Sequence, residues 1–245
     1  MAENIWLLAA LMGLAAALYS SVGHGGASAY LALMALFAVA PETMRPTALV
    51  LNVLVAGFGA SRFVLAKQMD WATFLPFAVT AIPMAFFAGR VHLPEETYRV
   101  LLGAVLLLAA ARYVVLPQID ASKVARRPTL AVSLPTGAAL GALAGLTGTG
   151  GGIFLSPLLV FLGWATPKNS AGIAAAFIVC NSLAGLAGQM SRLAALPMEL
   201  PILAGAVAIG ALIGVSLSIH LFSAKMLLRA LGLVLLVAGA KLLLT

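Results

Sequence analysis

Apolar residues fall into ten long runs along the chain, and the breaks between these runs are rich in charged residues, proline and glycine. An α-helix rises about 1.5 Å per residue, so about 20 residues cross the ~30 Å hydrocarbon layer of a bilayer. Most of the runs approach that length, which predicts a series of transmembrane helices. The predicted segments are residues 5–20, 27–40, 46–66, 71–91, 98–116, 130–147, 153–165, 170–190, 198–220 and 225–244.

Two of the predicted segments, 27–40 and 153–165, are too short to cross a bilayer. They hold about 14 and 13 residues, which corresponds to only about 20 Å of helix. Each follows a glycine-rich stretch, and we call these stretches the first glycine break (23–26) and the second glycine break (148–152). The sequence leaves open whether the two short segments span the bilayer or re-enter it.

The two glycine breaks belong to an internal repeat. They lie 126 residues apart, and each is followed after 15 residues by a proline, Pro41 or Pro167, which we interpret as a stop for the short segment. A polar linker, 117–129, separates a first repeat at 1–116 from a second repeat at 130–245. Each repeat holds five segments, and an odd number places the second copy upside down in the membrane. The pattern predicts an all-α integral membrane protein of two inverted repeats, the plan of many secondary transporters.

Positive charges predict the orientation of the segments. If the segments alternate in direction, five Lys and Arg residues lie on the side of the N-terminus, and nine lie on the side of the 117–129 linker. Basic residues collect in cytoplasmic loops, so we expect the linker in the cytoplasm and both termini outside. The residues before Ile5 lack the basic stretch of a signal peptide, and the chain from Ile5 onward is expected in the mature protein.

Composition excludes a soluble fold. Hydrophobic residues make up 63% of the 245 residues and charged residues only 9%, whereas a soluble domain carries about 25% charged residues. The surface must therefore contact a lipid bilayer. The net charge of +7 is explained by cytoplasmic loops rather than by a nucleic-acid partner. The single cysteine, Cys180, excludes an intrachain disulfide and a cysteine-based metal cluster, and no cofactor is expected.

The two glycine breaks form the predicted substrate site. Irregular backbone at membrane depth persists only inside protein or beside a water-filled cavity. A glycine-rich break before a short helix leaves the first N–H groups of that helix unpaired, and the helix dipole adds positive charge there, which suits an anion. The residues predicted to bind substrate are Gly23, His24, Gly25, Gly26, Ser28, Asn52, Thr149, Gly150, Gly151, Gly152 and Asn181.

Several of these residues have a second interpretation. Glycines also allow close helix packing in membranes, although packing does not explain why both breaks precede truncated helices. His24 either acts through its proton or is a neutral side chain that is hydrogen-bonded to a carbonyl. Asn52 and Asn181, which lie 129 residues apart, either contact substrate or join helices by hydrogen bonds.

No carboxylate is predicted inside a transmembrane segment. All seven acidic residues fall at segment ends or in loops: Glu3, Glu42, Asp70, Glu95, Glu96, Asp120 and Glu199. The carboxylate relay that is usual in proton-coupled transporters is therefore missing, and no buried negative charge attracts a cation. The favoured substrate is an anion.

The second glycine break and the residues after it, 148–157, resemble the TauE/SafE family of sulfite exporters, and the resemblance extends over essentially the whole chain. The first break departs from the motif, because His24 stands where Gly150 does and no proline matches Pro157. The resemblance implies transport of sulfite, sulfoacetate or a related sulfur-containing anion across the bacterial inner membrane.

The sequence thus predicts a secondary transporter, either an exporter or a facilitator, that binds a small anion without a metal. Two other classes stay open: a membrane subunit or scaffold that transports only with a partner, and an integral-membrane enzyme. An enzyme needs clustered catalytic groups, whereas the three histidines, His24, His92 and His220, are dispersed. The oligomeric state is also open, a homo-oligomer included.

Overall fold

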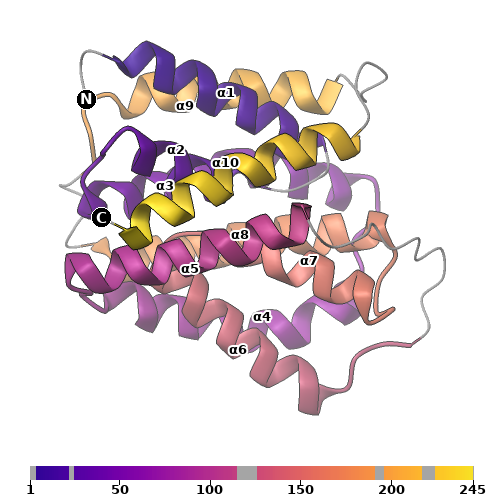
Figure 1. Cartoon of the computed structure of the whole chain (residues 1–245). Coiled ribbons are helices and arrows are strands. Elements are labelled where there is room, and N and C mark those ends of the chain that lie inside the picture. The colour runs from indigo at the N-terminus through magenta and orange to yellow at the C-terminus, as the bar shows by residue number, and fades with distance from the viewer. Residues whose placement is uncertain (1–3, 22–24, 115–125, 191–195, 217–223, 245) are drawn as a thin grey trace.

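The computed structural model describes residues 4–21, 25–114, 126–190, 196–216 and 224–244. Within those ranges the chain forms ten α-helices and no strand, so the predicted all-α fold is confirmed (Figure 1). The helices are α1 (Ile5–Ser21), α2 (Ala27–Leu36), α3 (Pro41–Leu65), α4 (Trp71–Arg90), α5 (Glu95–Val114), α6 (Leu130–Thr147), α7 (Gly152–Phe161), α8 (Pro167–Gly188), α9 (Leu200–Ser216) and α10 (Ala224–Leu244).

Two prolines begin long helices. α3 begins at Pro41 and α8 at Pro167, earlier than the predicted starts at residues 46 and 170. The first turn of a helix leaves its N–H groups unpaired, and the fixed φ of proline suits that turn. Each proline follows the end of a short helix, as predicted, but it also opens the next long helix, so the predicted starts at residues 46 and 170 were wrong.

The two short helices are shorter than the sequence indicated. α2 and α7 hold 10 residues each, whereas the predicted segments were 27–40 and 153–165. Ten residues of helix measure about 15 Å, which is about half of the hydrocarbon layer. Neither helix can cross a bilayer by itself.

α2 and α7 end in the same kind of turn. After α2, Ala38 adopts a φ of 55°, and the following N–H bonds back to the Met34 carbonyl at 2.9 Å. After α7, Gly163 adopts a φ of 66°, and the following N–H bonds back to the Leu159 carbonyl at 2.8 Å. Both are Schellman turns, which satisfy the last helical carbonyls and reverse the chain into the next long helix.

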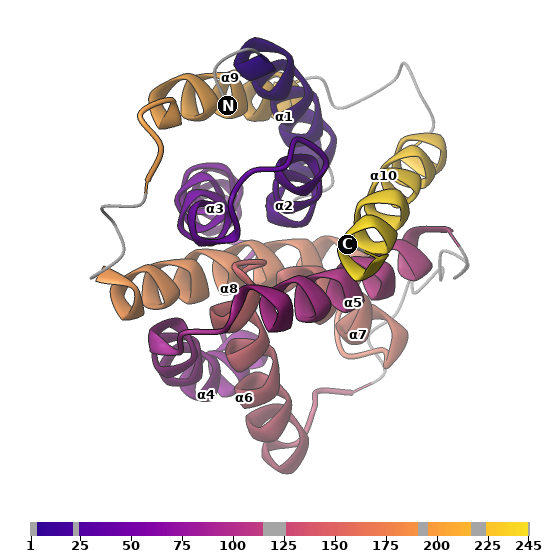
Figure 2. The same cartoon turned by 60° about the vertical axis from the view of Figure 1, so that its left-hand side comes forward.

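α3 and α8 pack against each other in the middle of the molecule, and most other helices pack in pairs around them (Figure 2). The pairs are α1 with α9, α4 with α6, and α5 with α10. Small residues bring the paired backbones close together. A side chain on Gly141 of α6 would collide with the Ala81 backbone of α4, and one on Gly210 of α9 would collide with the Gly13 backbone of α1.

Large apolar side chains cover much of the outer surface. Leu65 is 82% exposed, Trp6 73% and Phe161 66%. By length and composition, α3, α4, α6 and the Lys168–Gly188 part of α8 are sufficient to cross a membrane. Exposed apolar surface on this scale marks contact with lipid rather than with water, as expected for a multi-pass membrane protein.

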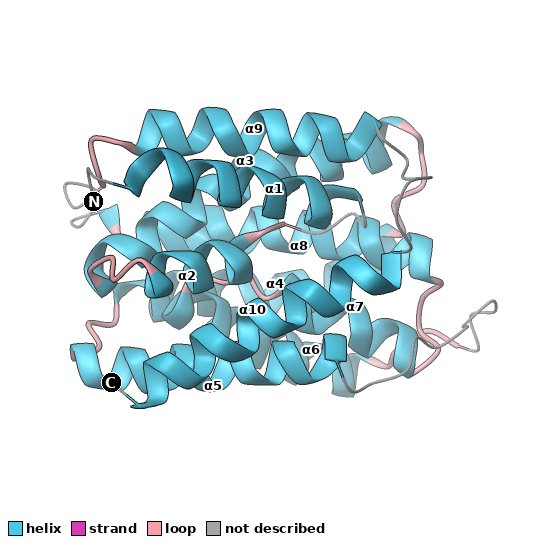
Figure 3. Cartoon of the chain, turned by 45° about the horizontal axis from the view of Figure 1, so that its top comes forward, coloured by secondary structure: helices cyan, strands magenta, loops and turns pink. Residues whose placement is uncertain are grey.

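The bundle has two ends, which we name by what lies there. At the termini end, α1 begins and α10 ends, and the chain passes from α2 to α3 and from α4 to α5 (Figure 3). At the linker end, α3 passes to α4 and α6 begins. This arrangement agrees with segments that alternate in direction, and its orientation across a membrane stays a prediction.

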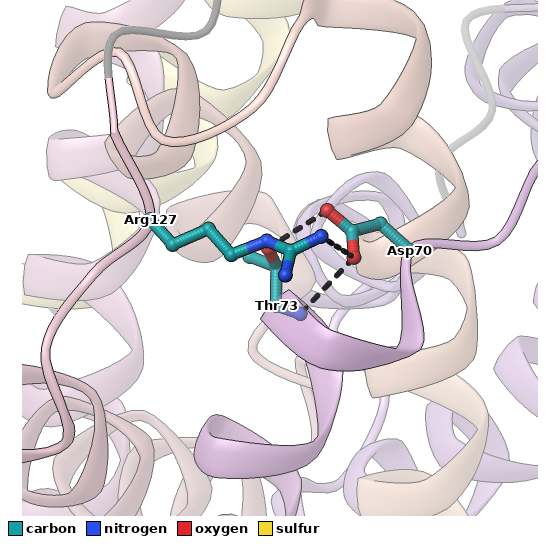
Figure 4. Close-up of polar contacts among 3 residues, drawn as sticks. All are labelled: Asp70, Thr73 and Arg127. Atoms are coloured by element: carbon teal, nitrogen blue, oxygen red, sulfur yellow. Dashed lines mark hydrogen bonds and ion pairs between the residues drawn. The ribbon is translucent and has the colours of Figure 1, made fainter.

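At the linker end, Asp70 caps the start of α4. Its carboxylate accepts hydrogen bonds from the Thr73 N–H at 3.3 Å and from the Thr73 hydroxyl at 2.8 Å, and an Arg127 guanidinium nitrogen lies 3.7 Å away (Figure 4). A capping carboxylate satisfies a donor that the helix itself cannot pair. Asp70 is therefore a structural acid, and Arg127 connects the residues before α6 to α4.

Candidate functional site

The starts of the two short helices lie close together in the interior. α2 starts directly after Gly26 and runs to the termini end, whereas α7 starts after Gly151 and runs to the linker end (Figure 3). A side chain on Gly25 would lie 3.2 Å from the Ile178 side chain, and one on Gly150 would lie 2.9 Å from it. The same buried residue of α8 therefore touches both glycine breaks.

Asn52 of α3 joins the two glycine breaks. Its side-chain oxygen accepts a hydrogen bond from the Ala27 N–H at 3.0 Å, and its side-chain nitrogen donates to the Thr149 carbonyl at 3.4 Å. Asn52 is fully buried, and Gly25 and Gly150 leave no room for side chains beside its amide. Of the two interpretations of Asn52, the hydrogen-bonded connection is the one that the structure displays.

The second glycine break adopts a backbone that only glycine accepts readily. Gly148, Gly150 and Gly151 have φ values of 84°, 75° and 75°, in the left-handed region. In α7 the first N–H that reaches a backbone acceptor is that of Phe154, which bonds the Gly151 carbonyl at 3.1 Å. Within the described residues the N–H of Ile153 has no acceptor. The start of α7 thus presents backbone donors to the interior.

The start of α2 differs from the start of α7. The sequence predicted unpaired N–H groups at the start of both short helices, but the Ala27 N–H of α2 donates a hydrogen bond to Asn52. Asparagine is a strong helix cap when it precedes a helix, and here the cap comes from another helix. The prediction of bare amides was therefore wrong at Ala27.

Asn181 and Ser182 of α8 are buried polar residues, and Ser182 lies beside the second break. Both are fully buried, and neither amide atom of Asn181 nor the hydroxyl of Ser182 has a hydrogen-bond partner in the described part of the chain. Asn181 and Ser182 follow Ile178 by three and four residues, which puts all three on one face of α8. The Ser182 oxygen would lie 3.2 Å from a side chain on Gly150. An unpaired buried polar group costs about 1–3 kcal/mol, so these groups call for a partner that the described residues do not supply.

The predicted site residues Thr149 and Ser28 have protein partners. The Thr149 hydroxyl shares a hydrogen bond with the Thr147 hydroxyl at 2.9 Å, and the Thr149 N–H donates to the same Thr147 oxygen at 3.3 Å. The Ser28 hydroxyl shares a 2.6 Å hydrogen bond with Tyr19. Thr149 therefore shapes the second break, and Ser28 joins α2 to α1.

Three glycines of the two breaks lie against Ile178: Gly25, Gly150 and Gly152. Asn52 lies beside Gly25 and Gly150, and Ser182 lies beside Gly150. Gly26 packs against the ring of Tyr30, and Gly151 against Phe177. Gly23 and His24 lie outside the described residues.

Sequence reasoning missed three buried polar residues near the breaks: Tyr30, Arg45 and Ser182. The Tyr30 hydroxyl is buried beside Gly26 and has no hydrogen-bond partner among the described residues. Ser182 could have been found from its helical spacing to Ile178 and its position next to Asn181. Arg45 was assigned to a loop because segment three was predicted to begin at residue 46.

Arg45 is a buried cation within α3 rather than a loop residue. It is 4% exposed, and its guanidinium donates hydrogen bonds to carbonyls at the ends of two other helices. These acceptors are Ala88, Gly89 and Val91 at the end of α4, and Gly145 near the end of α6. A cation stabilises the negative end of a helix dipole, so Arg45 fastens α4 and α6 to α3 next to the second glycine break.

These features define a class: a multi-pass membrane protein with a lipid-facing exterior and a buried polar site where two short helices begin. Comparison with known proteins is more specific. Residues 8–242 match the family described as sulfite exporter TauE/SafE, and the chain belongs to this family. It is also 38% identical over 244 residues, 98% of each chain, to the "Probable membrane transporter protein y4hK" of Sinorhizobium fredii (strain NBRC 101917 / NGR234). No solved structure matches the chain. Family and relative indicate a membrane transporter rather than an enzyme.

Proposed function

We propose that this protein is a secondary transporter, an exporter or a facilitator, of a small anion. The anion binds where the two glycine breaks meet, between the start of α7 and the Asn181–Ser182 pair of α8. The observation that carries the proposal is the pair of fully buried side chains without hydrogen-bond partners beside a helix start that offers backbone N–H groups. Hydrogen-bond donors at a helix start favour negative charge.

The proposed substrate class is a sulfur-containing oxyanion such as sulfite or a sulfonate. Its several oxygen acceptors suit the donors at this site, which are the Ile153 N–H, the Asn181 amide and the Ser182 hydroxyl. No acidic residue is among the described residues that contact the glycine breaks, so no carboxylate repels an anion there. The family description supports the same class of substrate.

The proposed mechanism is alternating access between two inverted repeats. In that scheme α1 to α5 correspond to α6 to α10, and a two-fold axis in the membrane plane exchanges them. Such an exchange turns the α1–α9 pair into the α6–α4 pair and returns the α3–α8 and α5–α10 pairs to themselves, and all four pairs occur. The pairing supports rocking of one repeat against the other around a fixed central site.

The proposed location is the bacterial inner membrane, with the termini end of the bundle on the side opposite to the cytoplasm. The bias of Lys and Arg toward the linker end supports this orientation. Because Arg45 is buried in α3, it no longer counts as a loop charge, and four residues then stand against nine.

The test is uptake of labelled sulfite and sulfoacetate into proteoliposomes that contain only this protein. Gly150→Ala should abolish uptake, because a side chain there is strained at φ 75° and would collide with Asn52. The matched control is Gly205→Ala in α9, where a side chain meets nothing within 4 Å, and uptake should stay at the wild-type level. Equal uptake by both variants contradicts the site.

The same preparation separates the proposal from its main alternative. Anion binding is measured as ligand-dependent thermal stabilisation of the purified protein, which rises with ligand concentration. Stabilisation together with uptake supports a self-sufficient transporter. If uptake occurs in cells but the purified chain neither binds nor transports, the chain is a subunit that requires a partner.

A further inference from the structure

A cavity of about 910 Å³ opens at the termini end, among the end of α2, the start of α3, the loop between α4 and α5, and the end of α10. It lies apart from the residues that the family resemblance and the sequence pointed to. The lining residues that carry its chemistry are Arg45, His92, Tyr98, Arg99, Gln189 and Lys241.

Charge in this cavity changes with depth. Arg45 is 4% exposed and Lys241 is half-buried, whereas the acids Glu42 and Glu95 are exposed. Water and salt screen exposed charges strongly and buried charges much less. Glu95 is also paired with Arg99 at 2.5 Å. The inner wall is therefore cationic, and the rim is mixed.

The two inner cations are held by backbone carbonyls. Lys241 of α10 donates hydrogen bonds to the carbonyls of Ala35 and Leu36, at the end of α2, at 3.0 Å each. Arg45 donates to carbonyls at the ends of α4 and α6. These hydrogen bonds fix the position of each cationic group in the inner wall of the cavity.

The inner wall of the cavity is also a wall of the second glycine break. The Tyr98 hydroxyl donates a hydrogen bond to the Thr147 carbonyl at 3.1 Å. A side chain on Gly148 would lie 3.1 Å from the Arg45 carbonyl oxygen and 3.2 Å from the Arg45 Cγ. A single layer of residues, Arg45 and Tyr98, thus separates the cavity from the start of the second break.

We propose that this cavity is an outer anion site, in which the charges of Arg45 and Lys241 hold a small oxyanion next to the second glycine break. The inference rests on the proposed anion transport, and it adds a second binding site and the face by which the substrate enters or leaves. A cleft whose walls carry one sign of charge concentrates ions of the opposite sign. Lys241 has a second effect, because it fastens α10 to the end of α2, the short helix whose start is capped by Asn52.

The chain offers a direct probe of this electrostatic field. Cys180 is its single cysteine, so a Cys180→Ala background leaves one engineered thiol for labelling. Ala40 lines the cavity at the start of α3, and Ala66 lies at the opposite end of the same helix; both are exposed. Ala40→Cys and Ala66→Cys are therefore a matched pair on one helix.

The measurement is the rate of thiol modification in purified, detergent-solubilised protein. Two methanethiosulfonate reagents are compared, one with a sulfonate group and one with a trimethylammonium group. For each thiol, the quantity compared is the modification rate of the sulfonate reagent divided by that of the trimethylammonium reagent. At Ala40→Cys this rate ratio should exceed the ratio for a free thiol by roughly tenfold, the lower part of the range for charged clefts. Lys241→Gln should lower the ratio at Ala40→Cys, Lys241→Arg should preserve it, and neither should change the ratio at Ala66→Cys. Inorganic sulfate should slow labelling at Ala40→Cys only.

Each outcome decides a separate point. A ratio at Ala40→Cys that equals the free-thiol ratio, or that does not respond to Lys241→Gln, overturns the outer site. If wild-type proteoliposomes still take up sulfite or sulfoacetate in that case, the proposed function stands without it. If Lys241→Gln lowers the rate ratio at Ala40→Cys while wild-type protein transports neither sulfite nor sulfoacetate, the outer site stands and the transport proposal fails.

Discussion

The two glycine breaks occupy matching positions in the chain, yet the buried asparagines that correspond to each other in the two halves differ in their hydrogen bonds. At the first break Asn52 caps the Ala27 N–H and reaches across to the Thr149 carbonyl. Asn181, which stands 129 residues after Asn52, is equally buried, and neither of its amide atoms has a partner among the described residues.

Burial of the short helices follows the same difference. Nine of the ten residues of α2 are buried, against five of the ten in α7. Asn52 of α3 therefore caps the more enclosed short helix, α2, whereas the Asn181 amide of α8 has no hydrogen-bond partner among the described residues. The comparison teaches that equal position in a repeat does not imply equal chemistry.

Asn52→Leu should have the largest effect. It leaves the Ala27 N–H and the Thr149 carbonyl buried without their partner, which should lower the free energy of unfolding by about 2–4 kcal/mol. Uptake should be lost as well, because the two breaks are no longer held together. Thermal unfolding of the purified variant and proteoliposome uptake measure the two effects. An unchanged melting temperature contradicts the structural role of Asn52.

Asn181→Leu should have the opposite effect on stability. It replaces an unpartnered buried amide by an apolar group of similar size, so the free energy of unfolding should rise by about 1 kcal/mol. Uptake should nevertheless fall by about tenfold to a hundredfold, since a hydrogen bond to an anion contributes about 1.5–3 kcal/mol. The same two measurements apply. A destabilised Asn181→Leu protein with normal uptake reverses the assignment of the two asparagines.

Ser182→Ala should sharpen the comparison within α8. Uptake should fall by about tenfold, the lower end of the range for one hydrogen bond to an anion, and the melting temperature should stay the same or rise. Ser133→Ala in α6 is the matched control. Ser133 is equally buried, but its hydroxyl donates to the Thr129 carbonyl at 3.0 Å, so this variant should lose stability and keep uptake. If both serine variants behave alike, Ser182 has no role in binding.

Asp70→Ala should have the smallest effect on function and calibrates the others. It removes the cap of α4 far from both breaks, which should cost about 1 kcal/mol of stability. The rate of uptake at saturating substrate should stay at the wild-type level in proteoliposomes. A drop in uptake in this variant means that a loss of stability alone reduces transport. That drop must then be subtracted before the loss of uptake in Asn52→Leu is assigned to the site.

Much of the fold could be predicted from the sequence. The ten apolar runs correspond to the ten helices, because segment length and polarity are local properties that the bilayer imposes directly. The starts at Pro41 and Pro167 were misjudged for a local reason: a proline that cannot continue one helix is well suited to begin another.

The site was harder to predict, because its decisive features depend on contacts between distant segments. The 129-residue spacing of Asn52 and Asn181 suggests a pair, but it contains no information about which amide finds a partner. Arg45 lies next to a predicted segment boundary, so only the packing of α3 against α4 and α6 reveals that it is buried. Ser182 stands next to Asn181 in the sequence, but only the structure shows that it lies beside Gly150.

The Schellman turns after α2 and α7 affect how the molecule moves. Each turn is fixed by its own hydrogen bonds and leads within a few residues into the rigid first turn of a proline-started helix. We therefore expect α2 with α3, and α7 with α8, to move as two stiff hairpins, so that a tilt of either long helix displaces the glycine break at the start of its short helix. Spin labels within one hairpin should keep a constant separation through the transport cycle, while labels on different hairpins move apart and together.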